Sequence, residues 1–320
     1  FSPHAGNIAQ QPRDLAEVTV QHILPARRNI LMHGLKDAGK SFGCLEITKT
    51  LVTGHALFGC IPSNDKGNVM YINSETPKED FLQRLEQFDI VDELGRHLFV
   101  LSKYDHAASD CAFSLTDPLF CVKIESLMEK MGCSYLILDN LTTLMKEGQA
   151  TQTIAVNKVY DWLERVQQRG ICVVVVHHTL DDGNAGTMSA KARGSADTSN
   201  RNHGELVLIG STQILEKKLG NEAIQRAAAQ DGLTVGICFK VCKAACVLQK
   251  KTFWLHLPLG APKWDFLAVT RADGEEIPFT PVDYTLLADP ELEADRMISG
   301  DDDNMGTELT GLSEEQRQIY

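Results

Sequence analysis

The sequence lacks long apolar runs, although 43% of its 320 residues are hydrophobic. No stretch approaches the ~20 consecutive apolar residues that a membrane-spanning helix needs. The first residues, Phe-Ser-Pro-His-Ala-Gly, also lack the charged and then apolar pattern of a signal peptide. The composition therefore predicts a soluble, intracellular, globular protein that has enough apolar side chains for a core and no membrane partner.

Paired cysteines are also missing, because none of the nine cysteines belongs to a C-x-x-C motif. Cys238, Cys242 and Cys246 recur every four residues in one apolar run, but no second pair of ligands accompanies them. Reduced thiols in the core are the favoured interpretation, and a metal site is the alternative. Scattered cysteines of this kind are typical of a reducing compartment.

Positive charge is scarce overall, since the formal net charge is −12, which at first argues against a nucleic-acid partner. The acidity is concentrated at the end of the chain, where residues 271–320 hold 14 Asp and Glu and three Arg. We predict that this segment is an acidic, partly disordered tail or linker. The rest of the chain is nearly neutral and is compatible with a local basic channel. Residues 1–14 predict a flexible N-terminal arm.

One stretch matches a phosphate-binding pattern at every defined position. Gly34-Leu35-Lys36-Asp37-Ala38-Gly39-Lys40-Ser41 fits G-x-x-x-x-G-K-[ST], and it lies between an apolar run and an expected helix that starts near Phe42. Backbone N–H groups of such a loop and of the helix N-terminus point at phosphate oxygens. Lys40 is expected to reach the β- and γ-phosphates, and the Ser41 hydroxyl to bind Mg²⁺. Residues 34–42 therefore predict a nucleotide-binding site.

Expected strands and helices alternate along the chain. The predicted strands lie near residues 28–33, 68–74, 98–101, 134–138, 171–176 and 205–209, and the predicted helices near 42–53, 78–88, 122–131, 154–168 and 214–230. Two later runs, 233–248 and 252–257, predict an antiparallel hairpin, and 264–269 an edge strand. This order indicates an α/β fold with a doubly wound, mostly parallel sheet and helices on both faces.

Polar groups follow several of these strands, and ligands bind at the carboxyl ends of such strands. Asp139 follows Tyr-Leu-Ile-Leu and is predicted to hold Mg²⁺ together with Ser41, although it could simply cap a helix. Asn140, not Glu, follows Asp139, so the catalytic carboxylate is not adjacent to it. Glu75, at the end of another strand, is the predicted base that activates water. Its alternative role is a favourable charge near a helix N-terminus.

His177 and His178 end the β-branched strand that follows. One of them is expected to sense the γ-phosphate and to relay its state to the long loop 180–204. A packed core histidine is the alternative for either, although polar pairs are not expected at a buried strand end. The residues by themselves do not choose between the two.

These motifs together resemble a known family. In chain order they are Ile23-Leu24-Pro25, Gly34–Ser41, Tyr71–Glu75, Leu136–Asn140, His177-His178-Thr179 and Arg193-Gly194-Ser195. The set resembles the RecA-like ATPases of the plasmid RepA type, relatives of DnaB-family hexameric helicases, over about residues 15–257. The resemblance implies a RecA-like ATPase domain over residues 15–270 that hydrolyses ATP with Mg²⁺ and moves on single-stranded DNA. It also implies that the domain forms a ring, which we expect to be a hexamer.

The resemblance also implies residue roles. Lys40 and Ser41 would bind phosphate and Mg²⁺, Glu75 would be the catalytic base, Asp139 the second Mg²⁺ residue and His178 the sensor. Arg84, nine residues after the glutamate, matches an arginine that the family also uses.

The chain departs from the family pattern at two places. Lys36 and Asp37 put a charge pair where small residues or proline are usual. The late strand lacks the family's Lys-x-Arg finger. The residue two positions after Lys243 is Ala245, and the residue two positions after Lys240 is Cys242, so neither is an arginine. Arg193 or Arg201 could substitute, although each could also be an ordinary loop arginine or contact DNA phosphate.

The loop 180–204 carries Lys191, Arg193, Arg201 and His203 and is the predicted contact for the single-stranded DNA backbone, with a plain solvated loop as the alternative. The predicted function is ATP hydrolysis coupled to translocation on, or unwinding of, DNA. Two alternatives stay open. One is a regulatory or scaffold ATPase that controls a protein partner, and the other is a nucleotide-binding module that hydrolyses weakly.

Overall fold

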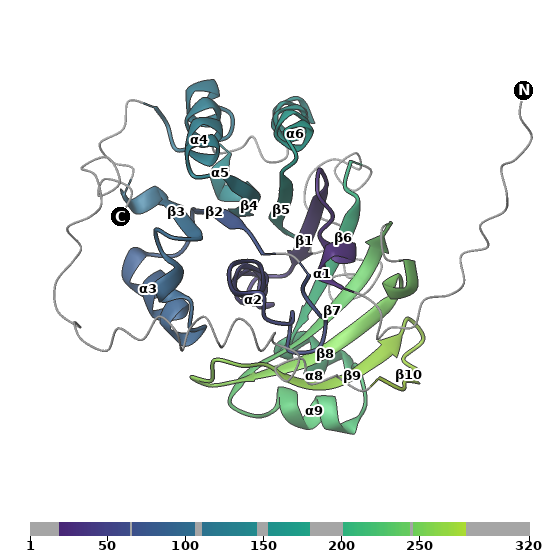
Figure 1. Cartoon of the computed structure of the whole chain (residues 1–320). Coiled ribbons are helices and arrows are strands. Elements are labelled where there is room, and N and C mark those ends of the chain that lie inside the picture. The colour runs from purple at the N-terminus through teal and green to yellow at the C-terminus, as the bar shows by residue number, and fades with distance from the viewer. Residues whose placement is uncertain are drawn as a thin grey trace, which may run out of the picture.

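The computed structural model describes residues 19–64, 66–105, 111–145, 153–179, 201–243 and 246–279. These residues form a ten-stranded sheet with the order β10-β9-β8-β7-β6-β1-β5-β4-β2-β3 (Figure 1). Neighbouring strands are parallel from β3 to β6 and antiparallel from β6 to β10. This arrangement confirms the predicted α/β fold with a mostly parallel sheet and an antiparallel C-terminal part.

The parallel strands are β1 (Asn29–Gly34), β2 (Asn68–Asn73), β3 (Leu98–Ser102), β4 (Cys133–Asp139), β5 (Cys172–His178) and β6 (Gly204–Gly210). The antiparallel strands are β7 (Gly232–Cys242), β8 (Lys251–Pro258), β9 (Asp265–Arg271) and β10 (Glu276–Ile277). The helices are α1 (Val20–Ile23), α2 (Lys40–Thr53), α3 (Lys78–Gln87), α4 (Pro118–Lys130), α5 (Leu141–Leu144), α6 (Thr153–Gln168), α8 (Ser211–Lys217) and α9 (Glu222–Ala228). None of these helices is long and apolar enough to cross a bilayer.

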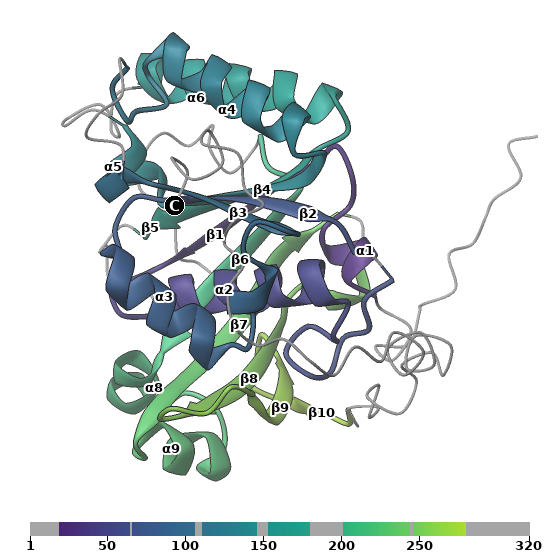
Figure 2. The same ribbon diagram turned by 60° about the vertical axis from the view of Figure 1, so that its left-hand side comes forward.

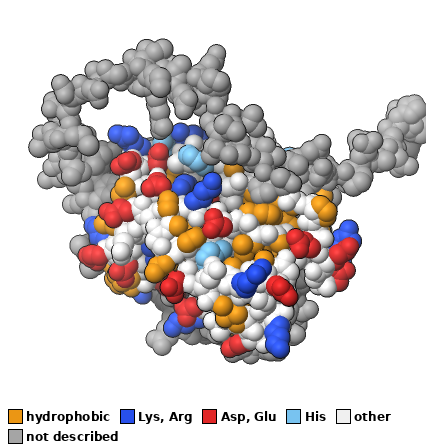
Figure 3. Space-filling view, turned by 90° about the horizontal axis from the view of Figure 1, so that it is seen from below, with side chains coloured by type: hydrophobic (Ala, Val, Ile, Leu, Met, Phe, Trp, Pro, Cys, Tyr) orange, Lys and Arg blue, Asp and Glu red, His pale blue; other side chains and the backbone are white. Residues whose placement is uncertain are grey.

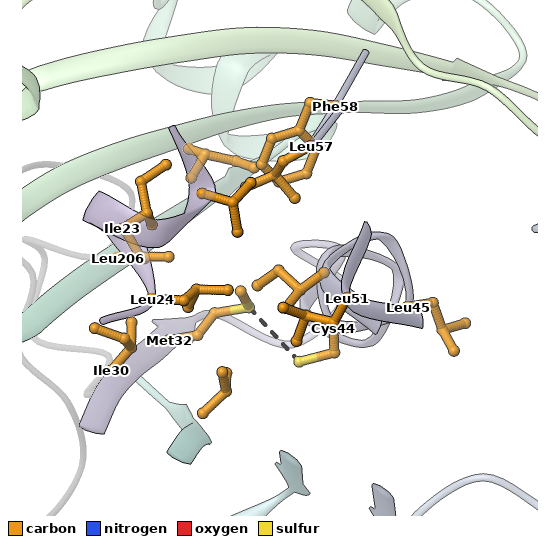
Figure 4. Close-up of a cluster of buried hydrophobic side chains, with 14 of the residues drawn as sticks. Ile23, Leu24, Ile30, Met32, Cys44, Leu45, Leu51, Leu57, Phe58 and Leu206 are labelled. Atoms are coloured by element: carbon orange, nitrogen blue, oxygen red, sulfur yellow. Dashed lines mark hydrogen bonds between the residues drawn. The ribbon is translucent and has the colours of Figure 1, made fainter. Parts of the chain in front are cut away.

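Helices cover both faces of the parallel strands, and this explains their continuous apolar sequences. Figure 2 shows α4 and α6 on one face and α2 and α3 on the other. In β1, Leu31 packs with the α4 and α6 side, whereas Ile30 and Met32 pack with α1 and α2. Figure 4 shows this second layer, in which the Cys44 thiol of α2 lies 3.9 Å from the Met32 sulfur. The central strand β1 is thereby held rigidly just before the phosphate loop.

Local signals place the helix starts. Asp117 caps α4 by accepting a hydrogen bond from the Leu119 N–H at 3.0 Å, and Pro118 occupies the first helical position, where no N–H is needed. Asn140 caps the short helix α5 by accepting from the Thr143 N–H at 3.1 Å. The residue that follows Asp139 is therefore a helix cap.

The structure corrects three predicted elements. The single helix expected over 214–230 is wrong, since Gly220 adopts a positive φ and Asn221 caps a new helix, which separates α8 from α9. The strand expected over 233–248 ends at Cys242 and is followed by a 3-10 turn over Cys246–Leu248. The strand expected over 264–269 is β9. It is not the edge strand that the sequence suggested, because it pairs with β8 on one side and with the short strand β10 on the other.

The sheet also continues beyond residue 270, where the sequence suggests that the ATPase domain ends, because Ile277 pairs with Val269. The predicted flexible arm, 1–14, and the acidic tail beyond Phe279 lie outside the described residues.

Candidate functional site

The phosphate loop connects β1 to α2 and lies against β6 and β7. A Cβ on Gly34 would come within 2.7 Å of the Leu208 carbonyl oxygen. Gly39 has a φ of +82°, and a Cβ there would lie 2.8 Å from a methyl group of Leu233. Both glycines of the motif are thus required by their surroundings as well as by close approach of a phosphate. Asp37, which stands where the resembled family usually has a small residue or proline, has a φ of 62° and an exposed side chain.

Lys40 is the first residue of α2, and only 7% of it is exposed. Its ammonium donates hydrogen bonds to the carbonyl oxygens of Gly34 at 3.1 Å and Leu35 at 2.6 Å. Burial lowers the pKa of Lys40, and the nearby carboxylates of Asp139 and Glu75 oppose this effect. The ammonium therefore lies over the loop, where it can exchange carbonyl partners for phosphate oxygens.

Asp139 ends β4 and is 2% exposed. Its Oδ2 accepts a hydrogen bond from the Tyr71 hydroxyl at 2.7 Å. Among the described residues, no donor reaches its Oδ1, which is buried. Burial raises the pKa of Asp139, whereas Tyr71 and the nearby Ser41 hydroxyl lower it. A buried carboxylate oxygen without a donor, close to a serine hydroxyl, fits a divalent cation.

No group of three or more His, Cys, Asp or Glu side chains in the described ranges could hold a metal ion by itself. Mg²⁺ commonly takes one or two protein ligands and completes its shell with phosphates and water. Ser41 and Asp139 could therefore supply the protein ligands of a nucleotide-bound Mg²⁺. Cys238 and Cys242, on β7, are both buried.

Glu75 follows β2 and faces the end of β5. Its Oε1 lies 3.6 Å from Nε2 of His178, and this nitrogen lies 3.3 Å from the Asn140 amide nitrogen. Interaction with the nearby His178 ring lowers the pKa of Glu75 and outweighs the opposite effect of burial. Glu75 is therefore ionised at neutral pH, the form that can accept a proton from water or orient it.

His178, and not its neighbour, is the histidine that reaches Glu75. The His177 side chain is 1% exposed and makes a hydrogen bond through Nδ1 to the Thr142 hydroxyl at 3.1 Å. Its position corresponds to the packed histidine that the sequence allowed for one member of the pair. The structure thus separates two histidines that the sequence alone did not distinguish.

A backbone network holds the ends of β2 and β4 together. The Ser74 hydroxyl donates to the Asp139 carbonyl oxygen at 2.9 Å and accepts from the Asn140 N–H at 3.0 Å. The Ser74 N–H also donates to the Asp139 carbonyl oxygen at 2.9 Å. Glu75 and Asp139 are therefore carried on strand ends that are fixed relative to each other.

Arg84, on α3, lies beside the end of the phosphate loop. Its guanidinium donates to the Thr76 hydroxyl at 3.3 Å and stacks over the Phe42 ring, with 5.2 Å from its central carbon to the ring centroid. The arginine that follows Glu75 by nine residues is thus close to both the loop and the strand that carries the glutamate.

Three of the lysine and arginine candidates for a finger role have partners elsewhere in the described chain. Lys240 donates to Glu205 at 2.8 Å, and Lys243 donates to the Asn202 carbonyl oxygen at 3.2 Å. Arg201 pairs with Asp161 at 2.9 Å. Arg193 lies outside the described residues, as does most of the loop 180–204.

Sequence reasoning missed a buried polar cluster next to the loop. His33 precedes Gly34 and bonds to Glu205 at 2.9 Å and to the Thr179 hydroxyl at 3.0 Å. Lys240 closes the cluster through Glu205. The signal was present, since His33 and Glu205 are polar residues inside otherwise apolar strands, but only the sheet order brings them together.

Comparisons with known proteins agree with this geometry. Residues 4–184 match the AAA domain family AAA_25, a span that contains the phosphate loop, Glu75, Asp139 and His178. No curated protein matches the chain. Among solved structures, a KaiC-like protein from the hyperthermophilic archaeon Pyrococcus horikoshii OT3 is similar, with a TM-score of 0.53 and 12% identity. The likeness covers 79% of this chain and 97% of that one, and at this identity it shows the fold alone.

The family match spans more than half of the chain and includes the complete phosphate-loop motif. The neighbouring structure supports a RecA-like arrangement of the sheet. The chain therefore belongs to the AAA domain family AAA_25 and is a RecA-like P-loop ATPase.

Proposed function

We propose that this ATPase forms a ring, in the simplest case a hexamer, and couples ATP hydrolysis to movement along single-stranded DNA. The observation that carries the proposal is the contact between His178 and Glu75. His178 ends β5 just before the loop 180–204, which holds the candidate DNA contacts. A change at the γ-phosphate would therefore act on a residue that leads directly into this loop.

In this mechanism, the backbone of the phosphate loop and Lys40 bind the β- and γ-phosphates. Ser41 and Asp139 would hold Mg²⁺, which would neutralise charge that develops on the phosphates. Glu75 orients the attacking water. A carboxylate with a lowered pKa is a weak base, so positioning of the water contributes more than early removal of its proton.

His178 would act as the sensor. Its Nε2 lies close to both Glu75 and Asn140, and Asn140 caps α5. Loss of the γ-phosphate changes the charge near Glu75, and the short contact passes this change to the end of β5. The next residue, Thr179, donates its N–H to the Gly34 carbonyl oxygen at 3.1 Å, so the strand end is also tied to the loop.

DNA contact is assigned to Lys191 and Arg193. The other two candidates in the loop have protein partners, because Arg201 pairs with Asp161 and His203 bonds to Arg28 at 2.7 Å. On the face shown in Figure 3, the described acidic and basic side chains are interspersed. That face therefore does not offer a continuous basic surface for a nucleic-acid backbone.

ATPase assays with and without single-stranded DNA test the proposal. We expect DNA to stimulate hydrolysis, and we expect binding to weaken steeply as salt rises, because phosphate contacts release counterions. Changing Lys191 and Arg193 together to Ala should remove most of the stimulation. Lys158→Ala, on the exposed side of α6, is the matched control and should retain it. Hydrolysis that ignores DNA at every salt concentration would overturn the DNA assignment.

The ring requires a separate measurement of mass in solution with ATP and with ADP. Assembly with ATP supports it, and a monomer under both conditions contradicts it.

The second candidate function is a regulatory ATPase that hydrolyses weakly. The commitment of Lys240 to Glu205 favours it, because this lysine is then not free to reach a neighbouring active site. Slow hydrolysis in an assembled ring, without stimulation by DNA, would support this alternative.

A further inference from the structure

Tyr71 is a buried tyrosine at the centre of the site that none of the roles above uses. It lies on β2, is 0% exposed and packs against Phe81 with 5.1 Å between ring centroids. Strand pairing aligns Asn73 with Asp139 and Tyr71 with Ile137. Tyr71 is therefore two residues before the partner of Asp139 and on the same face of the sheet, within reach of a diagonal contact.

The hydroxyl of Tyr71 donates its hydrogen bond to Oδ2 of Asp139 at 2.7 Å. A buried hydroxyl without a partner is costly, so this bond fixes the ring and the carboxylate together. The hydroxyl is the donor of this pair, because an ionised carboxylate oxygen can only accept.

The bond leaves the Asp139 carboxylate with one committed oxygen and one available oxygen. Oδ1 has no donor among the described residues. The backbone of Asp139 is also fixed, because its carbonyl oxygen accepts from both the N–H and the hydroxyl of Ser74. The direction of Oδ1 is therefore determined by Tyr71 on one side and by the strand on the other.

We propose that Tyr71 is a positioning residue for the metal: its hydroxyl holds Oδ2 of Asp139 so that Oδ1 is directed at the nucleotide-bound divalent cation. The inference rests on the proposed assignment of Asp139 to Mg²⁺. Partners of this kind, which bind a metal-binding side chain and not the metal, typically change metal affinity by 10- to 100-fold when they are removed.

Tyr71→Phe tests the proposal because it removes the hydroxyl and keeps the ring against Phe81. Mn²⁺ replaces Mg²⁺ as a spectroscopic probe, and its binding in the presence of ADP is titrated by electron paramagnetic resonance. We expect about a tenfold or greater loss of Mn²⁺ affinity. Affinity for ADP in the presence of a chelator should change less than twofold.

Tyr160→Phe is the matched control. Tyr160 is also fully buried, and its hydroxyl accepts a hydrogen bond from the Asn202 amide nitrogen at 3.3 Å. It should leave Mn²⁺ affinity unchanged. Thermal unfolding of both variants shows whether either has lost its fold.

Asp139→Asn separates the two levels of the inference. If Asp139→Asn leaves Mn²⁺ affinity unchanged, the metal assignment itself fails. If Asp139→Asn weakens Mn²⁺ binding but Tyr71→Phe does not, only the positioning role fails. In the double variant, Tyr71→Phe should cause no further loss, whereas additive losses would show that the hydroxyl acts by another route.

Discussion

Among single residues, Glu75 has the clearest expected effect on chemistry. Glu75→Gln keeps the shape of the side chain and removes the carboxylate that we propose orients water. We expect hydrolysis to fall by about 10²- to 10⁴-fold, while nucleotide affinity stays within a few-fold of the unchanged protein. Phosphate release and equilibrium binding of a fluorescent nucleotide measure the two quantities.

The control for this prediction is Glu79→Gln, on the first turn of α3, which is near in sequence but is not part of the contact with His178. It should hydrolyse ATP at nearly the original rate. Equal losses in both variants would indicate a general effect of charge near α3 and would remove Glu75 from its proposed role.

Glu46 gives a second prediction at this scale, on stability. It lies on α2, is 5% exposed and accepts a hydrogen bond from the Phe58 N–H at 2.9 Å. Burial raises its pKa from 4.5 to about 7. Because the folded pKa is raised, the group's stabilising contribution is complete below pH 4.5 and is lost as the pH rises through about 7.

Glu46→Gln keeps an acceptor for the Phe58 N–H and removes the titration. The variant should gain free energy of unfolding relative to the original protein as the pH rises from 5 to 8, by at most about 3 kcal/mol. Urea denaturation of both proteins at several pH values measures this difference. A difference that does not change with pH would contradict the buried, titrating carboxyl.

Single-residue roles were predictable from sequence to different degrees. Lys40 and Ser41 follow from a motif, and Asp139 and Glu75 from their positions after strands. Tyr71 and Glu46 do not, because their partners are set by the register between β2 and β4 and by the contact of α2 with residue 58. Nothing local to either residue identifies its partner.

Among elements, the contact between the phosphate loop and β6 is the most sensitive. A Cβ on Gly210 would lie 2.9 Å from the Ala38 Cα and 3.2 Å from the Asp37 carbonyl oxygen. Both neighbours are backbone atoms, so Gly210→Ala must displace the loop. We expect a loss of nucleotide affinity of about 10- to 100-fold in a protein that still folds.

Gly43→Ala is the matched control, on α2 itself. Its Cβ would meet only side-chain atoms at 3.5 Å or more, which is ordinary contact. Alanine is also preferred over glycine inside a helix by about 0.5–1 kcal/mol. This variant should bind nucleotide normally and melt at an equal or higher temperature. Normal binding by Gly210→Ala would mean that the loop is not held against β6.

The type of most elements, helix or strand, could be predicted from the sequence, but the residues at which elements begin and end were less predictable. The β-branched run of β5 identifies a central strand covered on both faces. The break between α8 and α9 was visible in Gly220 and Asn221, but periodic apolar residues on either side suggested one helix. The short strand β10 has two residues and no pattern of its own, and only its pairing with β9 defines it.

At the scale of the whole molecule, the cluster of Lys240, Glu205 and His33 joins three strands across the middle of the sheet. Burial acts to raise the pKa of Glu205, but hydrogen bonds from His33 and Lys240 outweigh it and leave the pKa lowered. The stabilisation is therefore present above the unfolded pKa of a glutamate and is lost as the pH falls through the folded value.

Lys240→Met should lower the free energy of unfolding at neutral pH by about 1–3 kcal/mol, because a buried carboxylate loses a charged donor. The loss should shrink at acidic pH, where Glu205 is protonated in both proteins. Lys243→Met is the control, since this lysine donates only to a backbone carbonyl oxygen in the contacts described, and it should cost less. Chemical denaturation at neutral and acidic pH gives both values.

The position of the phosphate loop between the two parts of the sheet bears on how the protein can be divided for experiments. The family match ends at residue 184, yet β6 pairs with β1, and Leu208 and Leu233 form one wall of the loop. A fragment cut at that boundary would expose the hydrogen-bonding edge of β1 and invite aggregation. Expression trials should therefore keep the chain through at least residue 279, so that β1 stays paired with β6 and the antiparallel strands of the sheet are complete.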